Sequence, residues 1–439
     1  MKKSTPLATR ILWGLVIGIL AALLTLGIGQ LHPPTLAFMR EVSSAVFDPF
    51  GQVFLRLLFF VVIPLVFASL AGGVAQLGKL AQLGPLAGRT FALFLLNMAI
   101  GVTIGLVMMN TLQPGLHMDP ATTEQLLAEY GSSQQAIPAQ AAQQKMNLAV
   151  VVEMFMPRNL MGAVSGSSRN SLGDVLPLIL FALLFGAATT QIAVERRRLV
   201  LDGLDAVTEI MMRIVHYALM LAPYAVPAMI YSVIVKAGLD VLLALSLFVL
   251  GCGLALALHL FGTMSVWIRF MTRWTPRRFF SIVKPVLITA FSTSSSNATL
   301  PTALTCATED LKLRQSTAGF VLPLGATMNM SGTALYEGCV VLFIAQIFGV
   351  DLSLGQQVVL MMLSVLSAVA VAGIPGGSLP LIAGLLATFG VPPEGIGIII
   401  GVDRILDMMR TTVNVGADIV TAAIVDERMA DAPAADAQS

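Results

Sequence analysis

The sequence predicts an all-α membrane protein that crosses the bilayer many times. Of its 439 residues, 56% are apolar and 11% are charged, whereas a soluble domain carries about 25% charged residues. Apolar segments of bilayer-spanning length recur along almost the whole chain, and the mean hydropathy is +0.86. These observations exclude a cytosolic enzyme of several domains and a disordered protein.

Charge balance and cysteine content exclude further classes. The 25 basic and 24 acidic residues nearly cancel, so the chain has no net field that would attract nucleic acid. The three cysteines lie in apolar runs and indicate reduced packing residues without disulfides. The four histidines are scattered, and no CxxC or HExxH motif occurs, so no organic cofactor or transition metal is expected.

The first element is an apolar run at 11–31 that follows Lys2 and Lys3. Such lysines are also typical of a signal sequence. The run has about 20 residues, which is enough to span a bilayer, and no small-x-small cleavage site follows it. We therefore predict a retained first transmembrane helix.

The later apolar segments are separated by loops of uneven charge. These segments lie at 44–71, 90–112, 147–192, 207–235, 240–268, 279–308, 316–349, 356–390 and 393–425. Basic residues cluster before the first segment, between the second and third, near 195 and before 280, and the positive-inside rule assigns these regions to the cytoplasm. The polar stretch 113–145 has almost no Lys or Arg and is expected outside. The multi-pass chain is thus expected in a cell inner (plasma) membrane, with both termini cytoplasmic.

Two apolar segments are interrupted by small polar residues, reading AFSTSSSNATLP at 290–301 and VAGIPGGSLP at 371–380. Broken backbone at membrane depth is tolerated only inside protein or beside a water-filled cavity, and a pair of such breaks indicates a transporter site. A polar cluster follows each break, at 329–333 and 407–414, which favours an internal repeat of hairpin and helix. Two ordinary loops joining full spans are the alternative, but each arm is short for a full span.

The segment 393–425 carries a polar stripe. At about 100° per residue, its members fall within a sector of about 80°; they are Asp403, Asp407, Arg410, Asn414 and Asp418. Each ionised side chain at mid-membrane costs at least about 2.5 kcal/mol, which favours a ligand site over ion pairs that merely join helices. Arg410 suits a carboxylate, Asp407 an ammonium, and Asp418 with backbone carbonyls a hard cation.

Four strings carry a resemblance to a known family. SSSNATLP, PLGATMNMSGTALYEG, AGIPGG and DRILDMMRTTVNVGAD, in this order, resemble the glutamate transporter family, the dicarboxylate/amino-acid:cation symporters. The resemblance extends from the first helix to about Val425. It implies eight transmembrane helices, two re-entrant helical hairpins and inverted repeats, in a homotrimer whose transport domains move like elevators against a scaffold.

The resemblance also implies a division of the chain. It assigns 1–75 to scaffold helices 1 and 2, 76–112 to transport-domain helix 3, 113–236 to an outer loop with scaffold helices 4 and 5, 237–425 to the rest of the transport domain, and 426–439 to a cytoplasmic tail. The segment 237–425 would hold helix 6, the first hairpin, helix 7, the second hairpin and helix 8.

Individual residues acquire roles from the same resemblance. The substrate contacts would be Ser295, Ser296, Thr333, Gly373, Ile374, Gly376, Asp407, Arg410, Thr411 and Asn414. One sodium site would use Asp418 with Gly325, Asn329 and Asn414, and another would use Thr327 and Met330. Glu337 would carry a proton; the alternative is a structural carboxylate bonded to a neighbouring helix.

The sequence departs from the family at a third sodium site. Ser331 replaces an aspartate that is usual there, and the helix-three positions that usually supply hydroxyls are Phe94, Asn97 and Met98. A hard cation needs several oxygen ligands, so this site is expected to be absent or weak. An arginine often found just before the hairpin serines is also missing, because Ser294 stands there.

Together these features predict a secondary symporter for acidic amino acids, driven by sodium, protons or both. A C4-dicarboxylate symporter of the same fold is the nearest alternative, although Asp407 would then have no ammonium to neutralise. A carrier of neutral amino acids would leave Arg410 unpaired. An intramembrane enzyme would need a base near the serine-rich hairpin, where no histidine lies. A ligand-gated channel is a further alternative, and an uptake assay in liposomes distinguishes it from a symporter. The expected partners are the substrate, membrane lipid and further copies of the chain in a homotrimer.

Overall fold

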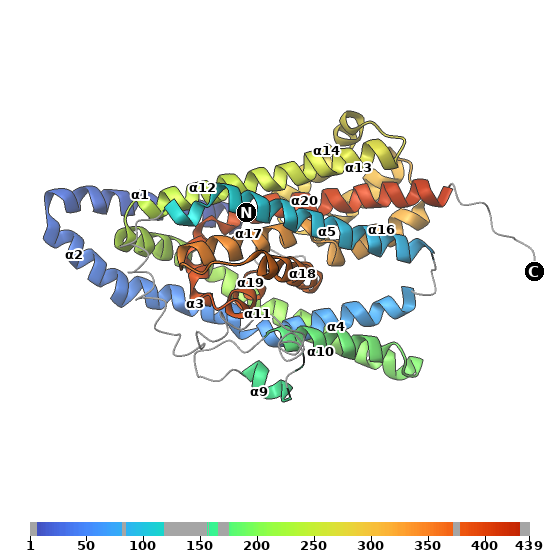
Figure 1. Cartoon of the computed structure of the whole chain (residues 1–439), viewed down its shortest axis with the longest axis horizontal. Helices are drawn as coiled ribbons and strands as arrows, with labels where there is room; N and C mark the ends of the chain where they lie inside the picture. The colour runs from blue at the N-terminus through green and yellow to red at the C-terminus, as the bar shows by residue number, and fades with distance from the viewer. Residues whose placement is uncertain are drawn as a thin grey trace, which may run out of the picture.

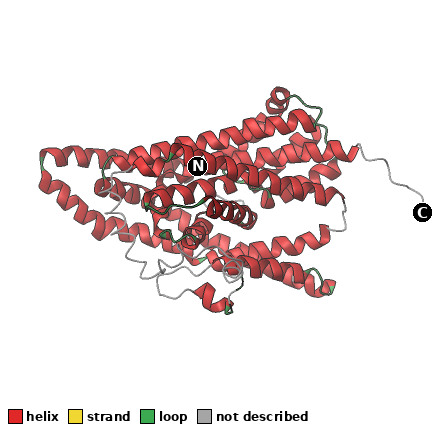
Figure 2. Cartoon of the chain, viewed as in Figure 1, coloured by secondary structure: helices red, strands yellow, loops and turns green. Residues whose placement is uncertain are grey.

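The structure is a computed structural model of the full chain, and it describes residues 7–80, 85–117, 156, 158–165, 175–371 and 378–430. All regular secondary structure in these ranges is helical, and Figure 2 draws no strand in them. The predicted all-α class is therefore confirmed. Most of the stretch predicted as an outer loop, from 118 to 145, lies outside the described residues.

The chain up to residue 237 forms long helices with short breaks. They are α1 Leu7–Leu31, α2 Pro33–Val42, the π turn η1 Ser43–Phe47, α3 Asp48–Phe60, α4 Val62–Leu80, α5 Pro85–Leu112, the 3-10 turn η3 Pro114–His117, α9 Leu160–Ser165, α10 Val175–Thr189 and α11 Val194–Ala237. The predicted apolar segment 44–71 is divided at Val61. Pro64 follows this break, in the first turn of α4, where a helix tolerates proline.

The rest of the chain holds both interrupted segments and the polar stripe. Its helices are α12 Asp240–Ala257, the π turn η5 Leu258–Thr263, α13 Met264–Met271, α14 Pro276–Thr293, α15 Ser296–Thr305, the π turn η6 Cys306–Asp310, α16 Gln315–Met328, α17 Ser331–Ile347, α18 Leu354–Ala370, α19 Leu379–Thr388, the 3-10 turn η7 Pro393–Gly395 and α20 Ile396–Ala430. The segment predicted at 240–268 continues through η5 into α13.

Helix α1 packs along α11, and glycines of α1 make room for prolines of α11. A Cβ on Gly14 would lie 2.9 Å from the carbonyl oxygen of Pro223, and one on Gly18 would lie 2.7 Å from that of Pro227. Small residues of this kind let membrane helices approach closely. The axis of α11 bends by 50° between Ala218 and Met220, where Pro223 removes a helical hydrogen bond.

Four helical spans among the described residues are long and apolar enough to cross a bilayer. They are Thr9–Leu31, Leu86–His117, Val241–Met271 and Gln315–Ile347, and the bent α11 makes a fifth when it is counted as one span. Helix α20 is not among them, because its polar stripe lowers its hydropathy. Several apolar helices are therefore present, while the number of eight spanning helices stays a prediction.

The first interrupted segment folds as a hairpin of α14 and α15, which pack on each other. Helix α14 ends where Ser294 adopts a left-handed conformation, with φ of 50°. Ser295 then caps α15, because its Oγ accepts the backbone N–H of Ala298 at 3.2 Å. The break is therefore narrower than the predicted stretch 290–301, since the small polar residues on either side of it remain helical.

The second interrupted segment connects α18 to α19, which also pack on each other. A capping box formed by Ser353 and Gln356 starts α18. The residues between the two helices, at 372–377, lie outside the described residues. They are the whole of the predicted AGIPGG motif.

The helices form two packing groups. Helices α1, α3, α4, α10 and α11 pack mainly on one another, and α5 packs with the helices that follow α11. Figure 1 shows α5 running beside α17 and α20, which come much later in the sequence. The groups meet where α20 crosses α1 and α11, and also where α18 and α19 pack on α3, α4 and α10. At the crossing of α20 with α1 and α11, a Cβ on Gly401 would lie 3.2 Å from the side chains of Leu15 and Ile230.

Candidate functional site

A cluster of polar and charged side chains lies buried on α20. Each of these residues lies three or four positions from another of them, so they share one face of the helix, and α20 packs against α14, α16 and α17. The buried members are Asp403, Asp407, Arg410, Thr411, Asn414 and Asp418. Burying charge is costly unless each charge is paired, so their partners indicate what this face can bind.

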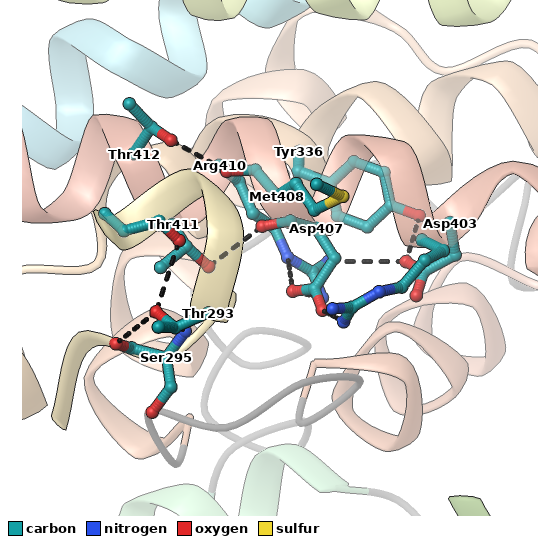
Figure 3. Close-up of polar contacts among 11 residues, drawn as sticks. Thr293, Ser295, Tyr336, Asp403, Asp407, Met408, Arg410, Thr411 and Thr412 are labelled. Carbon is teal, nitrogen blue, oxygen red and sulfur yellow. Dashed lines mark hydrogen bonds and ion pairs between the residues drawn. The ribbon is translucent and has the colours of Figure 1, made fainter. Parts of the chain in front are cut away.

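Arg410 and Asp407 form the centre of the cluster, as Figure 3 shows. The Nε of Arg410 donates to Oδ1 of Asp407 at 3.0 Å, and Nη2 lies 2.8 Å from the same oxygen. Both side chains are only 3% exposed. The Nη1 of Arg410 also reaches Oδ1 of Asp403 at 3.5 Å, so two carboxylates hold the guanidinium in place.

Tyr336 of α17 orients this cluster from the neighbouring helix. Its hydroxyl donates to Oδ1 of Asp403 at 2.8 Å, and the Cζ of Arg410 lies 4.6 Å from its ring centre, within the range of a cation–π contact. The sequence interpretation assigned no role to Tyr336. A phenol in an apolar helix needs a polar partner, and this requirement could have indicated from the sequence that Tyr336 contacts a polar group.

A second arginine, Arg404, also contacts Asp407. Its Nη1 donates to Oδ2 of Asp407 at 3.2 Å, and its side chain is 10% exposed. Both oxygens of Asp407 are therefore engaged by guanidinium groups. Arg404 was not predicted, because it lies at the edge of the polar stripe; its spacing of three residues from Asp407 was the available signal.

The first hairpin brings its tip to α20. Both α14 and α15 pack against α20, and Figure 3 draws Ser295 on the same side of this helix as Thr411. Ser296 is buried at the start of α15. The hydroxyl of Thr411 donates to the backbone carbonyl of Asp407 at 2.8 Å. The predicted contacts in the second hairpin, Gly373, Ile374 and Gly376, lie outside the described residues.

Asn414 joins α20 to the start of α17. Its Oδ1 accepts the backbone N–H groups of Gly332 at 2.7 Å and Thr333 at 3.2 Å, and its Nδ2 donates to Oγ1 of Thr333 at 3.0 Å. These bonds satisfy amides at a helix start that have no partner within the helix. The approach needs a glycine, because a Cβ on Gly332 would lie 2.5 Å from the carbonyl oxygen of Arg410.

Asp418 has the features of a cation ligand. It is buried, and the hydrogen bond that it accepts comes from Nδ2 of Asn329 at 2.9 Å; no basic side chain of the described residues forms an ion pair with it. A Cβ on Gly325 would collide with this carboxylate. Asn329 lies in the break between α16 and α17, where a broken helix leaves carbonyl oxygens for a cation. Three of the four predicted ligands of this sodium site, Asp418, Gly325 and Asn329, thus lie together. The fourth, Asn414, lies one helical turn before Asp418 on α20.

The residues predicted for a second sodium site flank the same break. The hydroxyl of Thr327 donates to the carbonyl of Leu324 at 3.0 Å, and Met330 is buried with its sulfur 4.0 Å from Oγ1 of Thr333. The described residues contain no group of three or more His, Cys, Asp and Glu side chains that could hold a metal ion. A cation here would therefore be held chiefly by carbonyl, hydroxyl and amide oxygens.

The residues that depart from the family at the third sodium site are buried where α5 packs against α17. Phe94 and Met98 contribute apolar side chains there. Asn97 donates to Oδ1 of Asn329 at 3.2 Å. The hydroxyl of Ser331 has no hydrogen-bond partner within the described part of the chain. This set offers one amide and one hydroxyl oxygen, which is few for a hard cation.

Glu337 is fully buried on α17, next to Tyr336. Neither of its carboxylate oxygens accepts a hydrogen bond of ordinary geometry from the described residues, and the hydroxyl of Ser367 on α18 faces it. An ionised carboxylate without partners is costly to bury, so this packing accommodates the protonated acid. A protonatable group thus lies one residue from the contact that orients Arg410.

The chain is similar to known proteins over almost its whole length. The model of the sodium:dicarboxylate symporter family matches residues 7–428. The proton/sodium-glutamate symport protein of Bacillus caldotenax is 31% identical over 428 residues, which cover 96% of this chain and 94% of that protein. The proton/glutamate-aspartate symporter of Escherichia coli is 29% identical, with 95% and 92% covered. The C4-dicarboxylate transport protein of Bacillus subtilis is 27% identical, with 96% and 93% covered.

Proposed function

Because the chain belongs to the sodium:dicarboxylate symporter family, we propose that it imports aspartate or glutamate together with cations. The observation that carries this proposal is the buried pair of Arg410 and Asp407, 2.8 Å apart at the centre of the cluster on α20. An acidic amino acid presents carboxylates and an ammonium, and this pair offers a partner for each charge. We propose that the protein, like the relatives named as symporters, is a transporter and not an enzyme.

Substrate binding would exchange contacts within the cluster. The guanidinium of Arg410 can turn from Asp407 to the side-chain carboxylate of the substrate, which it binds in a bidentate manner. Asp407 then takes the ammonium. Thr333 and Asn414 lie at the start of α17, where the helix dipole favours an anion. The serines of the first hairpin and the residues 373–376 of the second would enclose the ligand.

Coupling would come from cation sites beside the substrate. We propose one or two sodium sites, the first at Asp418 with Gly325, Asn329 and Asn414, and the second at Thr327 and Met330. The buried carboxylate of Asp418 supports the first. The side chains of Ser331, Phe94 and Met98 support the absence or weakness of a third. Glu337 would carry a proton, so that protons share the driving force with sodium.

A C4-dicarboxylate is the second candidate substrate. A relative named for C4-dicarboxylate transport covers almost the whole chain. Both oxygens of Asp407 already contact arginines, so this carboxylate is neutralised without an ammonium. Competition between aspartate and succinate for one site decides between the two substrate classes.

We propose that the assembly is an elevator-type homotrimer with eight spanning helices and two re-entrant hairpins. The two packing groups support a scaffold at 1–75 and 113–236 and a transport domain at 76–112 and 237–425. Gly401 marks a close crossing between them. The trimer would lie in the cell inner (plasma) membrane, and the basic clusters support cytoplasmic termini.

The test is uptake of isotope-labelled aspartate into proteoliposomes, with sodium and proton gradients imposed separately. We expect uptake above that of empty liposomes when either gradient is present, and the largest uptake with both. Ion currents evoked by aspartate without accumulation inside the vesicles would contradict a symporter and favour a ligand-gated channel.

Asp407→Asn is expected to separate amino acids from dicarboxylates. The change keeps the size of the side chain and removes the charge that faces the ammonium, so affinity for aspartate should fall at least about tenfold. Succinate lacks the ammonium and should lose much less. Asp202→Asn, on the exposed surface of α11, is the control for a lost carboxylate. Equal losses for aspartate and succinate would contradict the role of Asp407.

Glu337→Gln is expected to flatten the pH dependence of uptake. In the wild-type protein, uptake should accelerate as external pH falls, because protonation of Glu337 removes a charge that its surroundings do not pair. Glutamine is permanently neutral, so the variant should keep one rate across the same pH range. The measurement is the initial rate of aspartate uptake at fixed sodium. A pH profile identical to that of the wild type would assign Glu337 a structural role.

A further inference from the structure

Asp407 contacts two arginines of its own helix, one on each carboxylate oxygen. Arg410 binds Oδ1 through Nε and Nη2, at 3.0 and 2.8 Å. Arg404 binds Oδ2 through Nη1, at 3.2 Å. An ammonium that comes to Asp407 must therefore compete with one guanidinium for each oxygen.

Arg404 has hydrogen-bonding capacity beyond this contact. Its side chain is nine-tenths buried, and its Nε–H is buried without a hydrogen-bond partner among the described residues. Leaving a buried charged donor unpaired is costly, and Asp407 already has a partner in Arg410. A purely structural role for Arg404 does not explain why its Nε–H is left without an acceptor. An anionic ligand bound at the cluster would supply that acceptor.

The balance of charge at the cluster depends on Arg404. The buried charged side chains in mutual contact there are Asp403 and Asp407, which are acidic, and Arg404 and Arg410, which are basic. With Arg404 the four charges cancel, and without it the cluster has one excess negative charge. A neutral cluster accepts a dianion more readily than an anionic cluster does, and it attracts an ammonium less.

We infer that Arg404 is a specificity-determining residue of the substrate site, which competes with an ammonium for Asp407 and shifts selectivity from acidic amino acids toward C4-dicarboxylates. This inference rests on the proposed function, because it assumes that the cluster on α20 binds the substrate. It concerns the ratio of two affinities, whereas the proposed function concerns whether aspartate is transported.

The test is competition at the full-length protein in proteoliposomes, with unlabelled aspartate and succinate displacing a labelled substrate. Arg404→Gln removes the charge and keeps a polar side chain, and Arg404→Met is a second neutral variant of similar length. In both we expect the affinity for aspartate relative to succinate to rise at least about tenfold. Arg404→Lys keeps a cation beside Asp407 and should stay within about threefold of the wild type.

The control is Arg198→Gln, which removes one positive charge from a side chain on α11 that is 84% exposed, and it should leave the ratio unchanged. An unchanged ratio in a neutral variant of Arg404 that still binds both ligands would overturn the inference while leaving the proposed function intact. If the wild-type protein binds succinate but not aspartate, and the neutral variants of Arg404 bind both, the inference is supported. The same result would contradict aspartate as the substrate of the wild type. Binding of neither ligand by the wild type would contradict both.

Discussion

Replacing Arg410 by threonine is expected to abolish aspartate uptake. The guanidinium is 3% exposed and is the one cation of the cluster that contacts both Asp403 and Asp407. Removing one partner of a buried, hydrogen-bonded charge pair costs at least about 2 kcal/mol, and here the substrate also loses its carboxylate partner. We expect a fall in affinity for aspartate of at least about a hundredfold. The measurement is labelled aspartate uptake at saturating sodium.

The same variant is expected to accept small neutral amino acids. Threonine leaves space where the acidic side chain would lie, and Asp407 stays available for the ammonium, so serine or alanine can enter without an unpaired charge. Arg198→Thr, on the exposed surface of α11, should behave as the wild type. Undiminished aspartate uptake by Arg410→Thr would remove Arg410 from the substrate site.

Asp418→Asn is expected to uncouple uptake from sodium. The amide has the shape of the carboxylate and can still accept the hydrogen bond from Asn329, so the local packing is retained. The negative charge is lost, and a hard cation binds a neutral amide far more weakly than a carboxylate. We expect the sodium concentration for half-maximal uptake to rise at least about tenfold.

The measurement is initial uptake against sodium concentration, at a fixed pH and a fixed proton gradient. Asp351→Asn removes a carboxylate from an exposed loop and should leave the curve in place. A curve for Asp418→Asn that overlays that of the wild type would exclude Asp418 as a sodium ligand. A residual rate driven by protons alone is expected in the variant, because Glu337 is intact.

The helical class could be predicted because composition and hydropathy act over the whole chain. The positions at which helices break or bend were harder to predict, since they depend on the backbone conformation at single residues. The break near Val61 depends on Pro64, and the bend of α11 depends on Pro223. The first hairpin is broken over two residues, Ser294 and Ser295, whereas a polar stretch of twelve letters could not show which of its serines leave the helix.

The polar stripe could be predicted because helical periodicity puts its members on one face, and the structure places them together. Contacts between helices were less accessible. The bond from Tyr336 to Asp403 joins α17 to α20; a single sequence indicates that this phenol needs a polar partner, but not which residue supplies it. Arg404 lies at the edge of the stripe, where a long side chain decides by its conformation whether it reaches Asp407 or turns to the surroundings.

The charge on α20 has a consequence for how the protein is made. It is the last long helix of the described residues. As one of the proposed spanning helices, it would enter the membrane with Asp403, Arg404, Asp407, Arg410 and Asp418, and each such residue opposes insertion by about 2.5–3.5 kcal/mol near the centre of the bilayer. The helices that pack most extensively against it, α14, α16 and α17, are synthesised earlier. We therefore expect these helices to stay together near the insertion machinery until α20 follows, so that a misplaced α17 would leave the polar face of α20 without its partners.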